Sequence, residues 1–194
     1  MYKSCTTERS ALQQRQIETC FLSMLQKHPY NEITVSDLCE QAGLSRKTFY
    51  RLFGSKDDVL IALIDHTLMD YAKYRMPPED TSPDAPVEIQ KFFSYWKHCR
   101  PLLTALDDIH QTSLVTLRAV EHVLREEYGA LRWLGALNQS HSEEMVVFYI
   151  SAIMGLVIRW FESDYKRTVV EMSKILFKLM TTLPINDVKS LSLF

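Results

Sequence analysis

Residues 33–53 read ITVSDLCEQAGLSRKTFYRLF, and this stretch decides the fold. The Thr34 hydroxyl can cap the first turn of a short helix, and Asp37 can support it in a capping box. Gly43 can take the left-handed conformation that ends that helix, and Ser45 is placed to cap the next one. Two short helices joined by a tight glycine turn form a helix-turn-helix.

The second of these helices carries a local excess of positive charge. Phe49 and Phe53 are spaced i and i+4, so they predict a core-facing stripe and leave the other side chains pointing outward. Residues 46–56 contain four basic residues and no acidic one, in a chain whose formal net charge is -2. A local basic patch of this kind is what neutralisation of DNA phosphates requires. The alternative is that these basic residues form an ordinary solvated helix face. That alternative does not explain why a glycine turn and two helix caps occur beside them.

A helix-turn-helix binds DNA with the start of its second helix in the major groove, so its residues can be assigned either to bases or to phosphates. Arg46 and Lys47 are predicted to read base edges, since both side chains can donate to guanine O6 and N7. Thr48 is assigned to base and backbone together. The complete predicted DNA-binding set is Thr34, Ser45, Arg46, Lys47, Thr48, Tyr50, Arg51 and Lys56, of which Thr34, Tyr50, Arg51 and Lys56 are assigned to phosphates.

The same stretch, extended through Lys56-Asp57 and Leu60, resembles the N-terminal domain of TetR/AcrR-type transcriptional regulators. The shared pattern is a threonine before the motif, Ala-Gly-hydrophobic-Ser at the turn, Tyr-x-x-Phe in the second helix and Lys-Asp after it. The resemblance covers about residues 15–63. It implies a homodimer bound to a palindromic operator on double-stranded DNA, with Thr34, Tyr50 and Lys56 on phosphates. Two departures are Lys47, where many relatives carry a small residue, and Pro29-Tyr30, where relatives carry a glycine-containing end of the first helix.

Apolar residues recur at helical spacing along almost the whole chain, which predicts an all-α protein. We expect an N-terminal three-helix helix-turn-helix domain followed by a helical-bundle domain for dimerisation and ligand binding. The predicted division is 1–55 for the helix-turn-helix domain, 56–75 for a connecting helix, 76–86 for a Pro-rich acidic loop and 87–194 for the helical regulatory and dimerisation domain. The predicted helices include 8–27, 87–99, 101–109, 112–128, 142–163 and 168–182, with Pro184 ending the last.

In the C-terminal half, residues 92–95, 100–103 and 149–162 are similar to one C-terminal subclass of the same family, which implies a dimerisation and sensing domain. Independently, residues 145–161 are apolar nearly all round, and a second apolar surface favours a partner helix. Gly155 would allow close approach. The predicted dimer interface is Ile153, Leu156, Val157, Trp160, Ile175, Leu176 and Leu179. The alternative is that these side chains belong to the core of one monomer.

An effector pocket is expected among the C-terminal helices, apolar with a few polar groups. The candidate lining residues are Phe92, Trp96, Leu103, Leu106, Tyr149 and Met154. The alternative is that this stripe is simply packed core. No metal and no cofactor is expected, because His98, Cys99, His110, His122 and His141 lack the spacing of metal ligands.

The sequence contains no nucleophile elbow, phosphate-binding glycine loop or zinc-protease motif, so an enzyme is not expected. Cys5, Cys20, Cys39 and Cys99 form no Cys-x-x-Cys pair, the N-terminus is polar, and the apolar run 145–158 is short for a membrane span. These features favour a cytoplasmic protein with no membrane contact. The expected function is a sequence-specific DNA-binding regulator, a repressor released by a small-molecule effector. The alternative is a TetR-like regulator that acts through a protein partner or as an activator.

Overall fold

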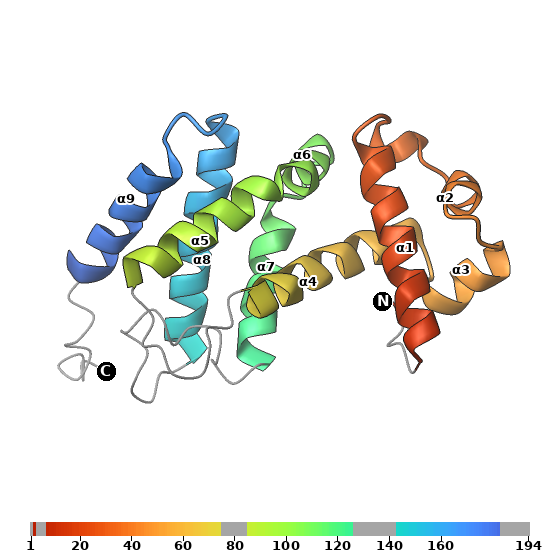
Figure 1. Cartoon of the computed structure of the whole chain (residues 1–194), viewed down its shortest axis with the longest axis horizontal. Coiled ribbons are helices and arrows are strands. Elements are labelled where there is room, and N and C mark those ends of the chain that lie inside the picture. The colour runs from red at the N-terminus through yellow and green to blue at the C-terminus, as the bar shows by residue number, and fades with distance from the viewer. Residues whose placement is uncertain (1, 3–6, 75–84, 126–142, 183–194) are drawn as a thin grey trace. The chain divides into compact units, whose positions relative to one another are not determined.

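The computed structural model describes residues 2, 7–74, 85–125 and 143–182, and within these ranges all regular structure is helical (Figure 1). The all-α prediction is confirmed. The chain forms two compact units. The N-terminal unit is residues 1–70 with 100–113, and the C-terminal unit is residues 71–99 with 114–194.

These units differ from the sequence division, which places all of 87–194 in one domain. Residues 100–113 cluster with the N-terminal unit because their helix, α6 (Arg100–Asp108), packs against α1 (Glu8–Leu25). The side chains of Leu102, Leu103 and Leu106 form the buried face of α6.

The N-terminal unit holds the predicted helix-turn-helix. After α1 come η1 (Tyr30–Glu32), α2 (Val35–Gln41), α3 (Arg46–Leu52) and α4 (Lys56–Tyr74), whose last four residues belong to the C-terminal unit. At the start of α4, the Ser55 hydroxyl accepts the Asp58 backbone N–H at 3.3 Å, and Asp58 accepts the Gly54 N–H at 2.9 Å. The predicted helix start after Gly54-Ser55 is therefore confirmed.

An aromatic and aliphatic core fixes the orientation of α3. Phe49 and Phe53 are fully buried, as predicted, with ring centroids 5.7 Å apart. Ile17 and Phe21 of α1 and Leu38 of α2 are equally buried. Burial of one such side chain stabilises the fold by about 1.5–3 kcal/mol. Rotation of α3 would expose Phe49 and displace Phe53, which follows the helix, so the polar face of α3 is held outward.

Polar contacts also hold α1 in place. Gln16 donates through Nε2 to the Ala42 carbonyl at the end of α2, at 2.8 Å. Arg15 forms an ion pair with Asp70 of α4, also at 2.8 Å. The helix-turn-helix is thus braced on one side by α1.

The C-terminal unit contains α5 (Ala85–His98), α7 (Ser113–Arg125) apart from its first residue, α8 (Glu143–Glu162) and α9 (Val169–Thr182). Helices α5 and α9 pack closely along their lengths (Figure 1). Phe93 of α5 meets Trp160 of α8 with ring centroids 5.4 Å apart. The Trp160 indole N–H donates to the Arg167 carbonyl at 2.8 Å, which anchors the turn before α9.

Several helix boundaries differ from the predicted ones. Helix α1 ends at Leu25 rather than Lys27, and α5 begins at Ala85, inside the predicted loop 76–86. Pro86 fits there because the first helical turn does not use its N–H groups for intrahelical bonds. Residues 75–84, residues 126–128 of the predicted helix 112–128, and Pro184 with the tail lie outside the described residues, as does residue 142.

Helix α8 is 20 residues long and, by length and composition, apolar enough to cross a membrane, although the run 145–158 alone is short for that. Such a helix is weak evidence for a membrane segment, because the core helix of a soluble protein has the same features. One stripe of α8 is in fact buried inside the C-terminal unit. It consists of Val146, Tyr149, Ile150, Ile153, Met154, Val157 and Trp160.

Candidate nucleic-acid interface

The glycine turn and the two caps have the predicted geometry. Gly43 adopts a φ of 62°, in the left-handed region that favours glycine. The Thr34 hydroxyl accepts the Asp37 N–H at 3.2 Å, while the Asp37 carboxylate accepts the Thr34 N–H at 3.1 Å, which completes the capping box. The Ser45 hydroxyl accepts the Thr48 N–H at 3.1 Å and so caps α3. These local bonds set the start of both helices.

Helix α3 presents a polar outer face. Phe49 and Leu52 are buried, whereas Arg46, Lys47 and Arg51 are exposed. Tyr50 is 52% exposed although its ring edge packs on Phe49 with centroids 5.4 Å apart. Base-reading and phosphate-binding side chains need this accessibility.

The two arginines of this face are already bonded within the protein. Arg46 donates to the Ser36 hydroxyl of α2, and Arg51 donates to the Gln13 amide oxygen of α1 at 2.7 Å. Lys47 makes no hydrogen bond or ion pair with the part of the chain that the structure describes. Its ammonium is therefore available to DNA without the loss of an internal contact.

The hydroxyl groups of Thr34, Ser45 and Thr48, all in the predicted DNA-binding set, form hydrogen bonds at the N-terminal caps of α2 and α3. Thr34 Oγ1 donates to Asp37 at 2.6 Å and also accepts the Asp37 N–H, so both of its hydrogen-bonding roles are used inside the protein. The hydroxyls of Ser45 and Thr48 lie 3.0 Å apart and share one hydrogen bond. Of the three, Thr48 is half-buried, and the other two are exposed.

Lys56 occupies a different environment from the other basic residues. Its ammonium donates to the backbone carbonyls of Tyr30 at 2.7 Å and Ile33 at 3.0 Å, and it lies 4.3 Å from the centroid of the Tyr30 ring. The Tyr30 hydroxyl in turn donates to Asp57. Burial, followed by this hydrogen bond, raises the pKa of Tyr30, so the phenol stays protonated as a donor. Sequence reasoning missed Tyr30 and Asp57 as partners; the departure at Pro29-Tyr30 was the available signal.

The six candidate ligand residues are all buried, but they divide between the two units. Phe92, Trp96, Tyr149 and Met154 belong to the C-terminal unit, whereas Leu103 and Leu106 belong to the N-terminal unit through α6. In the described part of the C-terminal unit, the Trp96 indole N–H and the Tyr149 hydroxyl are buried without a hydrogen-bond partner. Burial also raises the pKa of Tyr149.

The predicted dimer residues mostly face the interior of their own unit. Ile153, Val157, Trp160 and Leu176 are buried, Leu156 and Ile175 are half-buried, and Leu179 is 41% exposed. The reason is that α5 covers one face of α8 and packs along α9.

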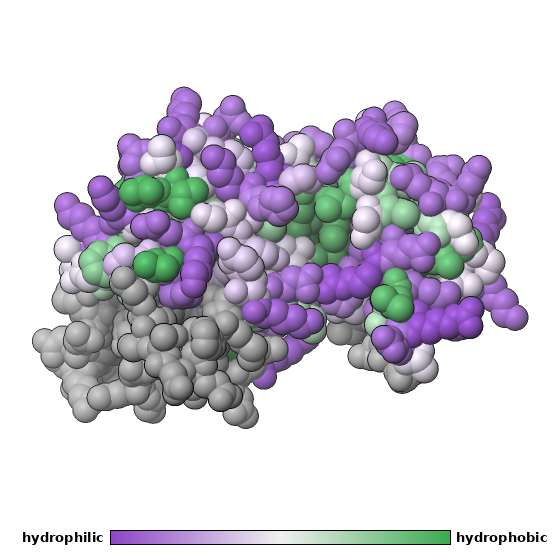
Figure 2. Space-filling view, in the orientation of Figure 1, coloured by the Kyte–Doolittle hydropathy of each residue, from purple (hydrophilic) through white to green (hydrophobic). Residues whose placement is uncertain are grey.

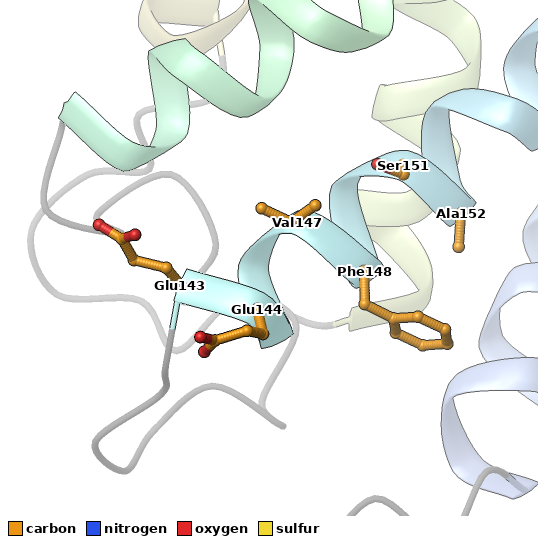
Figure 3. A pocket seen from close by; sticks show the side chains of 6 residues that line it. All are labelled: Glu143, Glu144, Val147, Phe148, Ser151 and Ala152. Carbon is orange, nitrogen blue, oxygen red and sulfur yellow. The ribbon is translucent and has the colours of Figure 1, made fainter.

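Other apolar side chains of α8 and α9 remain at the surface. On α8 they are Val147 and Phe148, and on α9 they are Val170, Phe177 and Leu179. Figure 3 shows Phe148 and Ala152 projecting from the same side of α8. Both side chains line an open surface hollow with a volume of about 650 Å³. Figure 2 shows apolar side chains over α9 among otherwise hydrophilic ones. Gly155 of α8 is exposed, and a Cβ placed there would have open space around it.

The described histidines and cysteines form neither a metal site nor a disulfide. Among residues 7–74, 85–125 and 143–182, no three His, Cys, Asp or Glu side chains gather closely enough to hold a metal ion. Cys20, Cys39 and Cys99 are free thiols, and burial raises the pKa of each. Cys5 and His141 lie outside the described residues.

Comparisons with known proteins match both halves of the chain to one family. Residues 22–63 match the model described as bacterial regulatory proteins of the tetR family, and residues 89–182 match a transcriptional regulator C-terminal region. The HTH-type transcriptional regulator EthR of Mycobacterium tuberculosis is 44% identical over 46 residues, which are 24% of this chain. This alignment spans about a fifth (21%) of the length of EthR.

Solved structures share the fold over most of the chain. A TetR transcriptional regulator from Streptococcus agalactiae has a TM-score of 0.60 at 20% identity, covering 89% of this chain and 95% of that one. FadR from Bacillus subtilis, solved in complex with stearoyl-CoA, has a TM-score of 0.51 at 15% identity, covering 87% and 97%. Regulators of this family bind DNA and dimerise, and some bind small molecules. The chain therefore belongs to the TetR family of bacterial regulatory proteins and is a DNA-binding transcriptional regulator, not an enzyme.

Proposed function

We propose that this regulator binds a palindromic operator as a homodimer, represses the neighbouring promoter and is released by a small-molecule effector. The observation that carries the proposal is the outer face of α3, where Arg46, Lys47 and Arg51 are exposed on a helix whose start is capped by Ser45. An exposed patch of this sign provides both the groove contacts and the salt-dependent phosphate contacts of a DNA reader.

Within that face, Arg46 and Lys47 are assigned to base edges because they occupy the first turn of α3. Tyr50 and Arg51, one turn further along, are assigned to phosphates. The bond from Arg46 to Ser36 and the bond from Arg51 to Gln13 must open or rearrange when DNA is bound. Lys47 needs no such exchange.

The homodimer is proposed to form through the outer faces of α8 and α9. Family members dimerise, and here Phe148 is 55% exposed next to Val147, which is 42% exposed; adjoining exposed apolar side chains are typical of an interaction surface. The open space at Gly155 suits the close approach of a partner helix. Of the residues predicted from sequence, Leu179 lies on such a face, and Leu156 and Ile175 are half-exposed.

An effector site in the C-terminal unit is supported by buried polar atoms that lack partners in the described residues. Trp96 Nε1, Tyr149 Oη and His122 Nε2 come from three different helices, α5, α8 and α7. Buried polar groups in native proteins are nearly always hydrogen-bonded. An apolar effector that carries a hydrogen-bond acceptor would satisfy the Trp96 indole, which can only donate.

The decisive experiment is selection and sequencing of genomic DNA fragments bound by the purified protein, followed by a mobility-shift assay. We expect a fragment with an inverted repeat. Replacement of Arg46 and Lys47 by alanine should abolish the shift while the protein remains a folded dimer. The control replaces Lys166 and Arg167, an exposed basic pair between α8 and α9. Equal binding by both double variants would reject α3 as the reading helix.

The direction of regulation needs a separate measurement. A reporter driven by the selected promoter should be weaker when the protein is expressed, and expression should recover when the effector is added. A reporter that becomes stronger would identify an activator instead. If operator binding persists in the presence of every small-molecule cell extract, release by an effector is rejected.

A further inference from the structure

Lys56 is the first residue of α4, yet its side chain turns back onto the segment that precedes α2. The ammonium lies 2.7 Å from the Tyr30 carbonyl oxygen and 3.0 Å from that of Ile33, with the Tyr30 ring face 4.3 Å away. An ammonium has three N–H donors. Two of them are used by these carbonyls, and the ring face attracts the same charge.

The next residue, Asp57, holds the other end of the same tyrosine by accepting a hydrogen bond from its hydroxyl. Two consecutive residues of α4 therefore grip Tyr30 at its backbone and at its phenol. Hydrogen bonds that involve a charged group are worth roughly twice as much as neutral ones. We call the set Lys56, Asp57 and Tyr30 the η1 clamp.

The η1 clamp bears directly on the start of α2. Ile33, whose carbonyl it holds, is 2% exposed and immediately precedes Thr34, the N-cap residue. Helix α2 packs on α3, and Ser36 of α2 bonds Arg46 of α3. A shift of η1 would therefore move the first turn of α2 and, through it, the base-reading face of α3.

From this geometry we infer that Lys56 and Tyr30 are positioning residues for the reading helix, and that Lys56 acts on α2 and α3 through the η1 clamp. The inference rests on the proposed function for the statement that α3 reads DNA. The η1 clamp, in contrast, is a property of the free protein. Separate experiments therefore test the clamp and the DNA-reading role of α3.

The first measurement is hydrogen exchange of the free protein, which requires no DNA. Lys56→Gln should speed exchange of the amides in residues 33–42 about tenfold or more, the effect of losing charge-assisted hydrogen bonds. Lys47→Gln, the same substitution at an exposed lysine without an internal bond, should leave those amides unchanged. Equal exchange in the two variants would overturn the clamp.

Tyr30→Phe provides a second variant in case Lys56→Gln does not fold. It keeps the ring and both carbonyl contacts and removes only the bond to Asp57. The same amides should exchange faster, by a smaller factor. Unchanged exchange would overturn the role of Tyr30. Lys56→Arg, which can also donate to carbonyls and stack on a ring, should restore most of the protection.

The second measurement is the salt dependence of binding to a duplex recovered by the genomic selection. Loss of a phosphate contact lowers the slope of log K against log salt by about 0.9. Lys56→Gln should weaken binding at every salt concentration, together with the faster exchange of residues 33–42. A slope lowered by about 0.9 with normal exchange would make Lys56 a phosphate contact only and overturn the inference. If the wild-type protein selects no DNA, the proposed function fails, while the exchange experiment still decides the clamp.

Discussion

The carboxylate of Glu18 on α1 lies 2.8 and 2.9 Å from Nδ1 of His66 on α4, and the Glu18 side chain is only 2% exposed. Arg15, at 3.7 Å, is a weaker and more exposed partner of the same carboxylate. This buried pair links the two long helices of the N-terminal unit. A carboxylate in such a place is tolerated only because it is bonded.

His66→Ala should therefore destabilise the protein by about 3 kcal/mol, because removal of one partner leaves a buried carboxylate without its main contact. Urea unfolding followed by circular dichroism measures this loss. His98→Ala, at an exposed position on α5, is the control and should change the free energy of unfolding by under about 0.5 kcal/mol. A similar small loss for both variants would show that Arg15 suffices for Glu18.

Gly43→Ala should cost about 1–2 kcal/mol, the penalty for a side chain in the left-handed region. A Cβ at Gly43 would meet no atom within 4 Å, so backbone strain is the whole effect. Gly43→Asn should cost less, since asparagine tolerates this conformation. Thermal unfolding of the three proteins gives the comparison, and equal losses for Ala and Asn would point to crowding instead.

Asp37 should titrate below the ordinary aspartate pKa of about 3.9. The side-chain hydrogen bond from Thr34, then the backbone bond from the same residue, lowers the pKa of this exposed carboxyl. Its stabilising contribution is thus fully present above the ordinary value and is lost as pH falls through the lowered one. Carboxyl NMR titration should show Thr34→Ala raising the Asp37 pKa, with Thr34→Ser close to the wild type. Identical titrations in all three proteins would contradict the capping box.

Phe148→Glu should convert the proposed dimer into monomers, because it places a charge where an apolar side chain would be buried against the partner. We expect a loss of association of about 100-fold or more, as for a central interface residue. Sedimentation velocity measures it, and circular dichroism confirms the fold. Leu117→Glu, at a 60% exposed position on α7, is the matched control. A Phe148→Glu protein that stays dimeric would assign the interface to another face.

The features that sequence predicted well depend on local chemistry. Thr34 and Ser45 cap their helices because their hydroxyls reach backbone amides three residues away. Gly43 forms the turn because glycine itself can adopt a positive φ. Phe49 and Phe53 share a face for the same reason. Such short-range relationships require no knowledge of what packs from elsewhere.

The features that sequence missed depend on distant partners. Helix α8 is apolar nearly all round, so its composition does not say which face its own unit covers. Trp160, predicted at the dimer interface, packs on Phe93 of the same unit. The carbonyls that hold Lys56 lie 26 and 23 residues earlier in the chain. Similarly, nothing local in residues 100–113 indicates that α6 joins α1.

The internal bonds of the basic residues have a consequence for the entropy of DNA binding. Arg46 and Arg51 are held in one rotamer by Ser36 and Gln13, so part of their side-chain freedom is already lost before DNA arrives. Lys47 keeps its freedom within the described structure and must give it up at the operator. DNA binding therefore exchanges one ordered contact for another at the two arginines, whereas it orders the side chain of Lys47 for the first time.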